Sequence, residues 1–293
     1  MPEPATDTGG GRLGVAKTYK LFIKGAFPRS ESGRSYVVES ADGTPLANAA
    51  RASRKDARDA VVAAREALAA WSGATAYNRG QVLYRVAELL EGRAGQFAGE
   101  VAAAEGVSLD EADRSIAAAI DRWVWYAGWA DKFAQVVGSA NPVAGPYFNF
   151  SLPEPTGVVA VVAPQDSSFL GLVSVLAPVI VTGNTAVLLA SELRPLPAVT
   201  LTEVLATSDL PPGVVNVLTG RTTEIAPVLA AHMDVNAIDL TGAAPADRTE
   251  LEKLCAGNLK RLLVRQDEWS ATPSVKRMKA FVEIKTVWHP LGT

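Results

Sequence analysis

The sequence is poor in the residue types that bind metals or form cross-links. Its 293 residues include 1 cysteine and 2 histidines. The single cysteine, Cys255, excludes an intrachain disulfide framework and is typical of a reducing compartment, so we expect a cytoplasmic protein. The isolated His232 and His289 give no metal-ligand spacing. The sequence therefore predicts neither a disulfide scaffold nor a metal site.

Long apolar runs and an excess of charge of one sign are also missing. The longest apolar stretch, residues 169–182, is too short to cross a bilayer and predicts a buried helix. The net charge of −3, with both signs interspersed, indicates neither nucleic acid nor a membrane as a partner. Residues 1–18 lack the apolar core of a signal peptide and are rich in small and polar residues, so we expect a disordered tail. The apolar fraction of 48% is that of a globular protein with an ample core.

Helical and extended patterns divide the rest of the chain into two parts. Up to residue 136 we expect short strands and then helices, the first of which is opened by Ser53 and Asp56 as a capping pair. From residue 157 onward, buried strands and helices alternate. The predicted strands are 157–163, 185–189, 214–218 and 236–240, and the helices between them are 169–181, 197–208 and 223–232. This alternation predicts a right-handed, parallel α/β sheet.

In such a sheet, ligands bind at the loops that follow the carboxyl ends of the strands. These loops begin at Pro164, Ala190, Gly220 and Thr241. None of them holds a Gly-x-Gly-x-x-Gly or a phosphate-loop motif. Ser167 or Ser168 with Asp166 and a histidine could form a hydrolase triad, but a serine-rich loop after a strand is more often a helix cap.

The loops and their spacing resemble those of the aldehyde dehydrogenase superfamily. The matching words are EPTGVV from Glu154, GNT from Gly183, SE from Ser191, LPPGVVNVLTG from Leu210 and TG from Thr241. The N-terminal part agrees through residues 23–25, 60–71 and 79–90, so that the resemblance covers residues 20–265. It implies a Rossmann-like domain with N-terminal helices at 19–144 and 157–268, and a small oligomerisation β-arm at 145–156 and 280–293.

Six residues replace groups that have a chemical task in the family. They are Gln165, Asp166, Leu189, Ala243, Asp247 and Arg265. Asp166 stands for the asparagine that binds the oxyanion, and its carboxylate would repel that charge. Leu189 stands for the lysine that binds the adenosine ribose. Asp247 would repel a pyrophosphate, and Arg265 stands for the glutamate that serves as general base.

The domain that carries the family's nucleophilic cysteine is also absent between Trp269 and Phe281. Cys255 precedes that place, in a helix that we expect at residues 249–258, and we interpret it as structural. The resemblance therefore assigns no catalytic residue. It leaves a vestigial cofactor site at Ser191, Glu192, Gly220, Thr241 and Gly242. We expect no bound cofactor.

Residues 147–154 and 281–288 resemble the family's oligomerisation strands, and the second of these pairs with a neighbouring subunit in the family. The whole chain resembles the non-catalytic second half of two-domain aldehyde dehydrogenases. This implies an inactive structural or regulatory subunit that forms a homo-oligomer, or a hetero-oligomer with a complete aldehyde dehydrogenase.

Two alternatives stay open. One is an NAD- or NADP-dependent aldehyde oxidoreductase, with residual activity or completed by a partner's catalytic residues. The other is a protein that binds a nucleotide or another anion at Ser191, Glu192 and Arg221, with Arg265 as a further candidate in the crevice, although solvated or ion-paired arginines are the commoner outcome.

Overall fold

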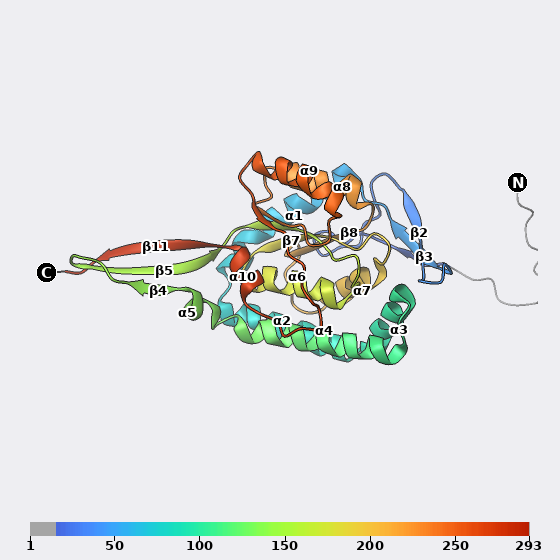
Figure 1. The fold of residues 1–293 in the computed structure, drawn as a ribbon, viewed down its shortest axis with the longest axis horizontal. Coiled ribbons are helices and arrows are strands. Elements are labelled where there is room, and N and C mark those ends of the chain that lie inside the picture. The colour runs from blue at the N-terminus through green and yellow to red at the C-terminus, as the bar shows by residue number, and fades with distance from the viewer. Residues whose placement is uncertain (1–15, 293) are drawn as a thin grey trace, which may run out of the picture.

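A five-stranded parallel sheet forms the centre of the molecule in a computed structural model that describes residues 16–292 (Figure 1). The strand order is β10-β9-β6-β7-β8. The strands are β6 (Val158–Val162), β7 (Thr185–Leu189), β8 (Val215–Leu218), β9 (Ala237–Asp239) and β10 (Arg261–Leu263). The predicted parallel α/β sheet is confirmed, with β10 as an edge strand that the sequence pattern did not indicate.

Helices cover both faces of this sheet (Figure 1). One face carries α2 (Ala76–Glu91), α3 (Ala94–Glu105), α4 (Leu109–Trp129), α6 (Leu170–Val181) and α7 (Leu196–Leu205). The other carries α1 (Arg54–Gly73), α8 (Thr222–Ala231) and α9 (Pro245–Ala256). Along β6, Val159 and Val161 pack into the first layer, whereas Val158 and Val162 pack into the second. A strand buried on both faces needs a continuous apolar run, which is what the sequence has there.

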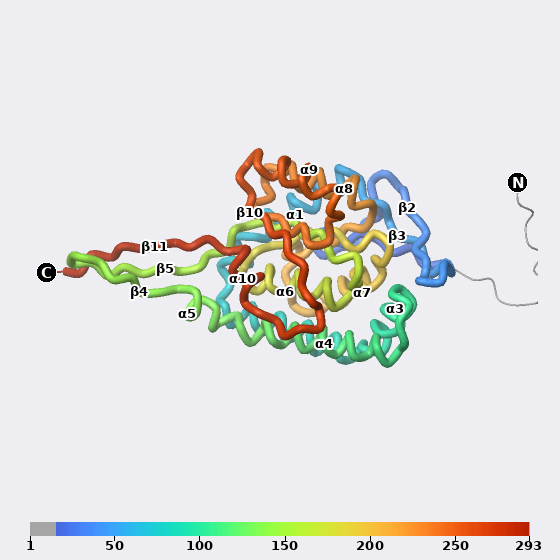
Figure 2. The backbone as a smooth tube through the Cα atoms, in the orientation of Figure 1, coloured from blue at the N-terminus to red at the C-terminus, as the bar shows by residue number. Residues whose placement is uncertain are grey.

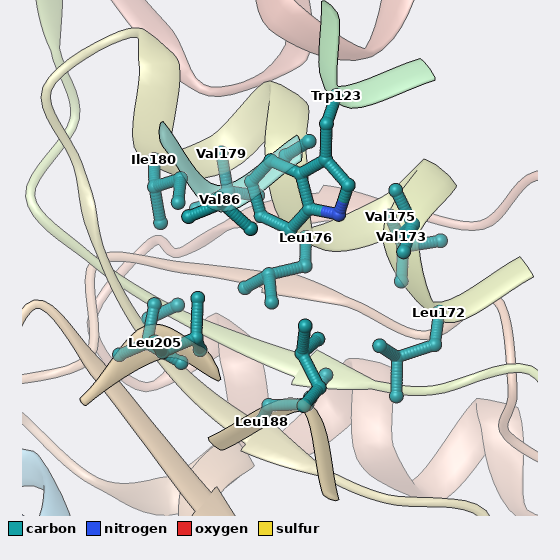
Figure 3. Close-up of a cluster of buried hydrophobic side chains, with 14 of the residues drawn as sticks. Val86, Trp123, Leu172, Val173, Val175, Leu176, Val179, Ile180, Leu188 and Leu205 are labelled. Carbon is teal, nitrogen blue, oxygen red and sulfur yellow. The ribbon is translucent and has the colours of Figure 1, made fainter. Parts of the chain in front are cut away.

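The larger core lies between the sheet and the first helical layer (Figure 3). Trp123 of α4 is fully buried there, near Val86 of α2 and Val175 and Val179 of α6. Every residue of α6 is buried, so its apolar run is explained by packing inside the protein. Among residues 16–292, none of the helices is both long and apolar enough to cross a membrane.

A small sheet, in the order β1-β3-β2, lies beyond the β8 edge. Its strands are β1 (Thr18–Tyr19), β2 (Ser35–Glu39) and β3 (Pro45–Ala50). Thr18, which we assigned to the tail, pairs with Asn48 in this sheet, so the predicted tail extends too far. The rest of the tail prediction concerns residues 1–15, which lie outside the described residues.

A three-stranded arm extends away from the helices (Figure 1). It follows the short helix α5 (Phe133–Val137) and consists of β4 (Ser139–Asn141), β5 (Tyr147–Pro155) and β11 (Val282–Pro290). β11 pairs antiparallel with β5 over its whole length, from Val282 opposite Pro155 to Pro290 opposite Tyr147. β4, which we placed in the helical domain, pairs with the other edge of β5. The second edge of β11 has no strand partner within residues 16–292.

Residues 264–281 connect the central sheet to the arm (Figure 2). This connection leaves β10, runs across to α4 and returns through α10 (Lys276–Ala280) to β11. The connection leaves no room for a separate catalytic domain, which confirms the predicted fold class.

Candidate functional site

The carboxyl ends of the central strands border a cavity of 720 Å³, which we call the crevice. Of the five predicted cofactor residues, Glu192, Thr241 and Gly242 line it. Gly220 lines a neighbouring cavity of 480 Å³, which Glu192 and Arg221 also border. Ser191 lies buried beside them. The loops therefore meet at one edge of the sheet, as parallel strands require.

Gln165 organises the loop after β7. Its Oε1 atom accepts hydrogen bonds from the backbone N–H of Glu192 at 2.9 Å and from Ser191 Oγ at 3.2 Å. Its Nε2 atom donates to the carbonyl of Ala163 at 2.8 Å. The Gln165 side chain thus ties the end of β6 to the end of β7, and the Ser191 hydroxyl is used in that contact.

Glu192 has its carboxylate turned toward the start of α8. Oε2 accepts a hydrogen bond from the backbone N–H of Thr222 at 3.0 Å, and Oε1 forms an ion pair with Arg221 at 3.5 Å. A carboxylate at a helix N-terminus satisfies an N–H group that would otherwise lack a partner. Both carboxylate oxygens of Glu192 are therefore used at the start of α8. In a cofactor site of the predicted kind, the same oxygens would bind the ribose.

The two glycines of the predicted cofactor site are required by packing. A Cβ atom on Gly242 would lie 1.8 Å from the carbonyl oxygen of Ala163, and Gly242 N–H donates to Val162 at 3.0 Å. Gly220 has a φ of 143°, and a Cβ atom there would lie 3.2 Å from the Ala52 nitrogen. Close approach of backbone to backbone explains both glycines without a ligand.

Thr241 belongs to a buried ion-pair network that the sequence did not reveal. Asp239 Oδ1 accepts hydrogen bonds from the backbone N–H of Thr241 at 2.9 Å and from its hydroxyl at 2.5 Å. Arg277, from α10, donates to Asp239 Oδ2 at 2.5 Å and to Thr241 Oγ1 at 3.1 Å. Both charged side chains are almost fully buried. The only signal in the sequence was an aspartate inside an apolar strand.

Asp267 extends this network toward the surface. It accepts from Arg277 Nε at 2.8 Å and forms an ion pair with Arg265. Burial of Asp267 opposes its ionisation, but the bonds from Arg265 and Arg277 outweigh burial and lower the pKa of this carboxyl. Arg265 lines a different cavity from the crevice and is ion-paired, which is the outcome that we expected to be the commoner one for such an arginine. The ion pair with Asp267 holds the Arg265 guanidinium outside the crevice.

Acidic side chains outnumber basic ones on the wall of the 720 Å³ cavity, although Glu192 and Asp267 are paired with arginines outside it. The ionisable residues that line it are Asp166, Glu192, Asp247, Asp267 and Arg248. Four carboxylates therefore face one guanidinium. Asp247 lies in the first turn of α9, where its charge occupies the place that a helix N-terminus offers to an anion. This set of residues does not fit a dinucleotide, whose pyrophosphate would be repelled.

Leu189, Asp166 and Ala243 are the remaining residues that stand where the family has a functional group. Leu189 is fully buried in the core beneath α1 and α8. Asp166 lies at the cavity wall and accepts a weak hydrogen bond from Trp269 Nε1 at 3.4 Å. Ala243 lies at the cavity wall as well.

The structure does not assemble the hydrolase triad. Ser168 is buried, and its hydroxyl donates to Glu105 at 2.6 Å. Ser167 Oγ accepts from the backbone N–H of Gly171 and so caps α6. His232 lies at the end of α8, and His289 lies in the arm opposite Phe148. Both serines are therefore engaged in local structural contacts.

Cys255 and the histidines form no reactive cluster. Cys255 belongs to α9 and faces the core, where burial raises the pKa of its thiol. This surrounding agrees with a structural role. Within the described part of the chain, no three potential metal ligands of the His, Cys, Asp or Glu type come together.

Comparison with known proteins identifies the family. Residues 27–271 match the profile of the aldehyde dehydrogenase family. The chain belongs to this family. An aldehyde dehydrogenase of Davidiella tassiana is 31% identical over 244 residues, which are 83% of this chain and 49% of that protein.

Solved structures of aldehyde dehydrogenase fold are similar over the same region. HpcC from Thermus thermophilus has a TM-score of 0.79 at 30% identity, covering 84% of this chain and 47% of that one. The NAD+ complex of aldehyde dehydrogenase from Bacillus cereus has a TM-score of 0.78 at 25% identity, covering 85% and 50%. The chain of this aldehyde dehydrogenase family member thus spans about half the length of these relatives.

Proposed function

We propose that this aldehyde dehydrogenase family member is catalytically inactive and acts as a structural or regulatory subunit of an aldehyde dehydrogenase assembly. The observation that carries the proposal is the wall of the crevice, where Glu192 and Asp267 are already ion-paired and Asp166 and Asp247 add carboxylates that form no ion pair among the described residues. A developing oxyanion and a dinucleotide are both anionic. Neither is stabilised by such a wall.

This chain also lacks the chemical groups that aldehyde oxidation requires. The mechanism needs a thiolate nucleophile, an oxyanion donor, a base and a hydride acceptor. The only cysteine is buried in a core, and its raised pKa opposes thiolate formation. Asp166 and Arg265 stand at the positions of the oxyanion donor and the base. Loss of one such group lowers a rate, whereas loss of all removes the mechanism.

The arm supports the assembly part of the proposal. Ile284 and Trp288 are 52% and 58% exposed on one face of the arm, and Phe148 and Leu152 are 48% and 43% exposed on the other, and exposed apolar side chains on an open sheet typify interaction sites. The second edge of β11 offers unpaired backbone N–H and C=O groups among the described residues. A strand added at this edge would lie beside Ile284 and Trp288 of β11 and cover part of their apolar surface.

Purification from native cells under non-denaturing conditions tests the subunit role. We expect the tagged protein to co-purify in stable proportion with a complete aldehyde dehydrogenase or as a defined homo-oligomer. Trp288→Lys should abolish the assembly, because it places a charge in the apolar contact, and its fold should be unaffected, because Trp288 is 58% exposed. The mass in solution, measured by light scattering, reports the result.

Val62→Lys provides the matched control. Val62 is 51% exposed on α1, away from the arm, so the same charge there should leave the assembly intact. A monomer without partner in native extracts would contradict the subunit role. Equal assembly of wild type and Trp288→Lys would contradict the role of the arm.

The NAD- or NADP-dependent oxidoreductase remains the second candidate. It is favoured by the NAD+ complex of the Bacillus cereus relative, which shares the fold at 25% identity. In this alternative, a partner supplies the nucleophile. Micromolar binding of NAD or NADP in calorimetry would support it and would contradict the repulsion expected from the crevice.

A further inference from the structure

A third cavity adjoins the connection between β10 and α10 and shares only Gln266 and Asp267 with the crevice. It has a volume of 250 Å³ and lies between α4, α6 and residues 265–277. Three arginines line it, namely Arg122, Arg265 and Arg277. None of the predicted cofactor residues borders this cavity.

Tyr126 contributes a hydroxyl donor to this cavity. The residue is only 2% exposed and lines the cavity, and among residues 16–292 its hydroxyl is not one of the fully buried polar atoms that lack a partner. Burial raises the pKa of Tyr126 to about 12, so the hydroxyl keeps its proton at neutral pH. An acceptor in the cavity would receive a hydrogen bond from this group.

Arg122 lies one turn before Tyr126 on the same face of α4. Its two terminal nitrogens donate to Ser174 Oγ at 2.6 Å and to the carbonyls of Trp269 and Ala271 at 2.8 Å each. These acceptors are all neutral. The Nε atom of this buried arginine has no partner among the described residues. Arg122 therefore carries a positive charge into the protein with no carboxylate hydrogen-bonded to it.

The three arginines of the cavity differ in how their charges are compensated. Arg277 is neutralised by Asp239, and Arg265 by Asp267. Glu268 also lines the cavity, but it is exposed to solvent at the rim, where its charge is screened. The charge of Arg122 remains inside. A buried cation without a counter-ion is unfavourable, and an anion bound beside it would be stabilised.

We propose that this cavity, the Arg122–Tyr126 pocket, binds a small oxyanion, that is, a carboxylate or phosphate group. The guanidinium supplies the charge, and the tyrosine hydroxyl supplies a hydrogen bond. The volume of 250 Å³ lies below the range of about 300–1,000 Å³ that is usual for drug-sized ligands. The ligand is therefore a free small anion and not a nucleotide. This site is independent of the subunit role proposed above.

Calorimetric titration of the full chain with inorganic phosphate, and separately with propionate, tests the site. We expect at least one of the two anions to bind with 1:1 stoichiometry, and the tighter one identifies the class of oxyanion. Tyr126→Phe removes only the hydroxyl and should weaken that anion's binding by about tenfold. Tyr84→Phe is the matched control, because Tyr84 is an exposed tyrosine on α2, and it should leave the affinity unchanged.

Two further variants locate the bound anion. Arg122→Gln should abolish binding, although it also removes contacts to the connection, so the outcome for Tyr126→Phe decides. Arg221→Gln changes an arginine of the 480 Å³ cavity and should have no effect. The proposal is overturned if neither anion binds at concentrations up to about 10 mM, which corresponds to a dissociation constant weaker than that value. Equal affinities of wild type and Tyr126→Phe, or loss of binding in Arg221→Gln, would overturn it as well.

Discussion

The crevice and the arm of this protein treat their polar and apolar groups in opposite ways. In the crevice, Ser191, Glu192 and Thr241 each have a partner within the chain. In the arm, Phe148 and Trp288 are 48% and 58% exposed. The region that would bind a cofactor has its polar groups engaged within the chain, whereas the region that would bind another chain leaves apolar groups exposed.

The two regions therefore contribute to the fold in different ways. The crevice keeps its loops because Gln165, Glu192 and Arg277 use them for internal contacts that hold the sheet edge together. The arm keeps a register of nine residue pairs between β5 and β11 while leaving apolar surface uncovered. Substitutions in the crevice should therefore change folding, and substitutions in the arm should change assembly.

The largest effect is expected at Arg277. Arg277→Met leaves Asp239 without its buried counter-ion, while Asp267 keeps Arg265, and breaking a buried pair in this way costs about 3–5 kcal/mol of unfolding free energy. Urea denaturation measures it. Arg261→Met is the control, because it breaks an exposed pair with Glu283 that is worth about 0–1 kcal/mol. If the two variants lost equal amounts of unfolding free energy, the buried network of the crevice would stabilise the protein no more than the exposed pair does.

Gly242→Ala should have the next largest effect. The added methyl group would overlap the carbonyl of Ala163, and overpacking of this kind costs about 1–3 kcal/mol. Gly99→Ala in α3 is the control, since no atom lies within 4 Å of the new Cβ and helix propensity favours alanine by about 1 kcal/mol. If Gly242→Ala were neutral in thermal unfolding, packing would not explain this glycine.

Removing negative charge from the crevice should raise its affinity for a dinucleotide. Asp247→Asn removes the carboxylate in the first turn of α9, and we expect NAD to bind about tenfold more tightly, which corresponds to about 1.4 kcal/mol. Calorimetry with NAD measures the change. Glu252→Gln, which alters the same helix outside the cavity, should leave the affinity as it is. Unchanged binding in Asp247→Asn would show that charge is not what repels the ligand.

The smallest effect concerns acid stability. The pKa of Asp267 is lowered in the folded state from its usual value of 3.8. The stabilisation by Asp267 is thus complete above that value and is lost as the pH falls through the lower folded pKa. Unfolding free energies measured between about pH 5 and pH 2 should fall less steeply for Asp267→Asn than for wild type. Asp113→Asn, at an exposed carboxylate of α4, should keep the wild-type slope.

Elements with strong local signals were predictable from the sequence. Ser53 caps α1 by accepting from Lys55 and Asp56, and the Asp56 side chain completes the capping box, as the sequence indicates. β7 has the predicted bounds because a buried parallel strand needs a continuous apolar run. β3 was missed, since its residues Pro45–Ala50 have low β-propensity and are held in place by pairing with β1 and β2.

The site was predictable in position but not in its contacts. The four loops follow from the order of strands and helices, which places them at one edge. The partner of Asp239 is 38 residues away in the sequence, and nothing local to Arg277 indicates that pairing. The same applies to Arg265, whose direction is decided by Asp267 and not by its position after β10. Side-chain direction depends on tertiary contacts that a one-dimensional pattern does not contain.

The pairing of β5 with β11 has a consequence for the time course of synthesis. Ser151 and Thr286, which share a hydrogen bond across these strands, are 135 residues apart in the chain. A ribosome adds about 5–20 residues per second, so β5 emerges roughly 7–27 seconds before its own partner strand exists. During that interval its edge can accept a strand from another nascent or finished chain. Whether β5 pairs with its own β11 or with a strand of another chain is therefore decided during synthesis.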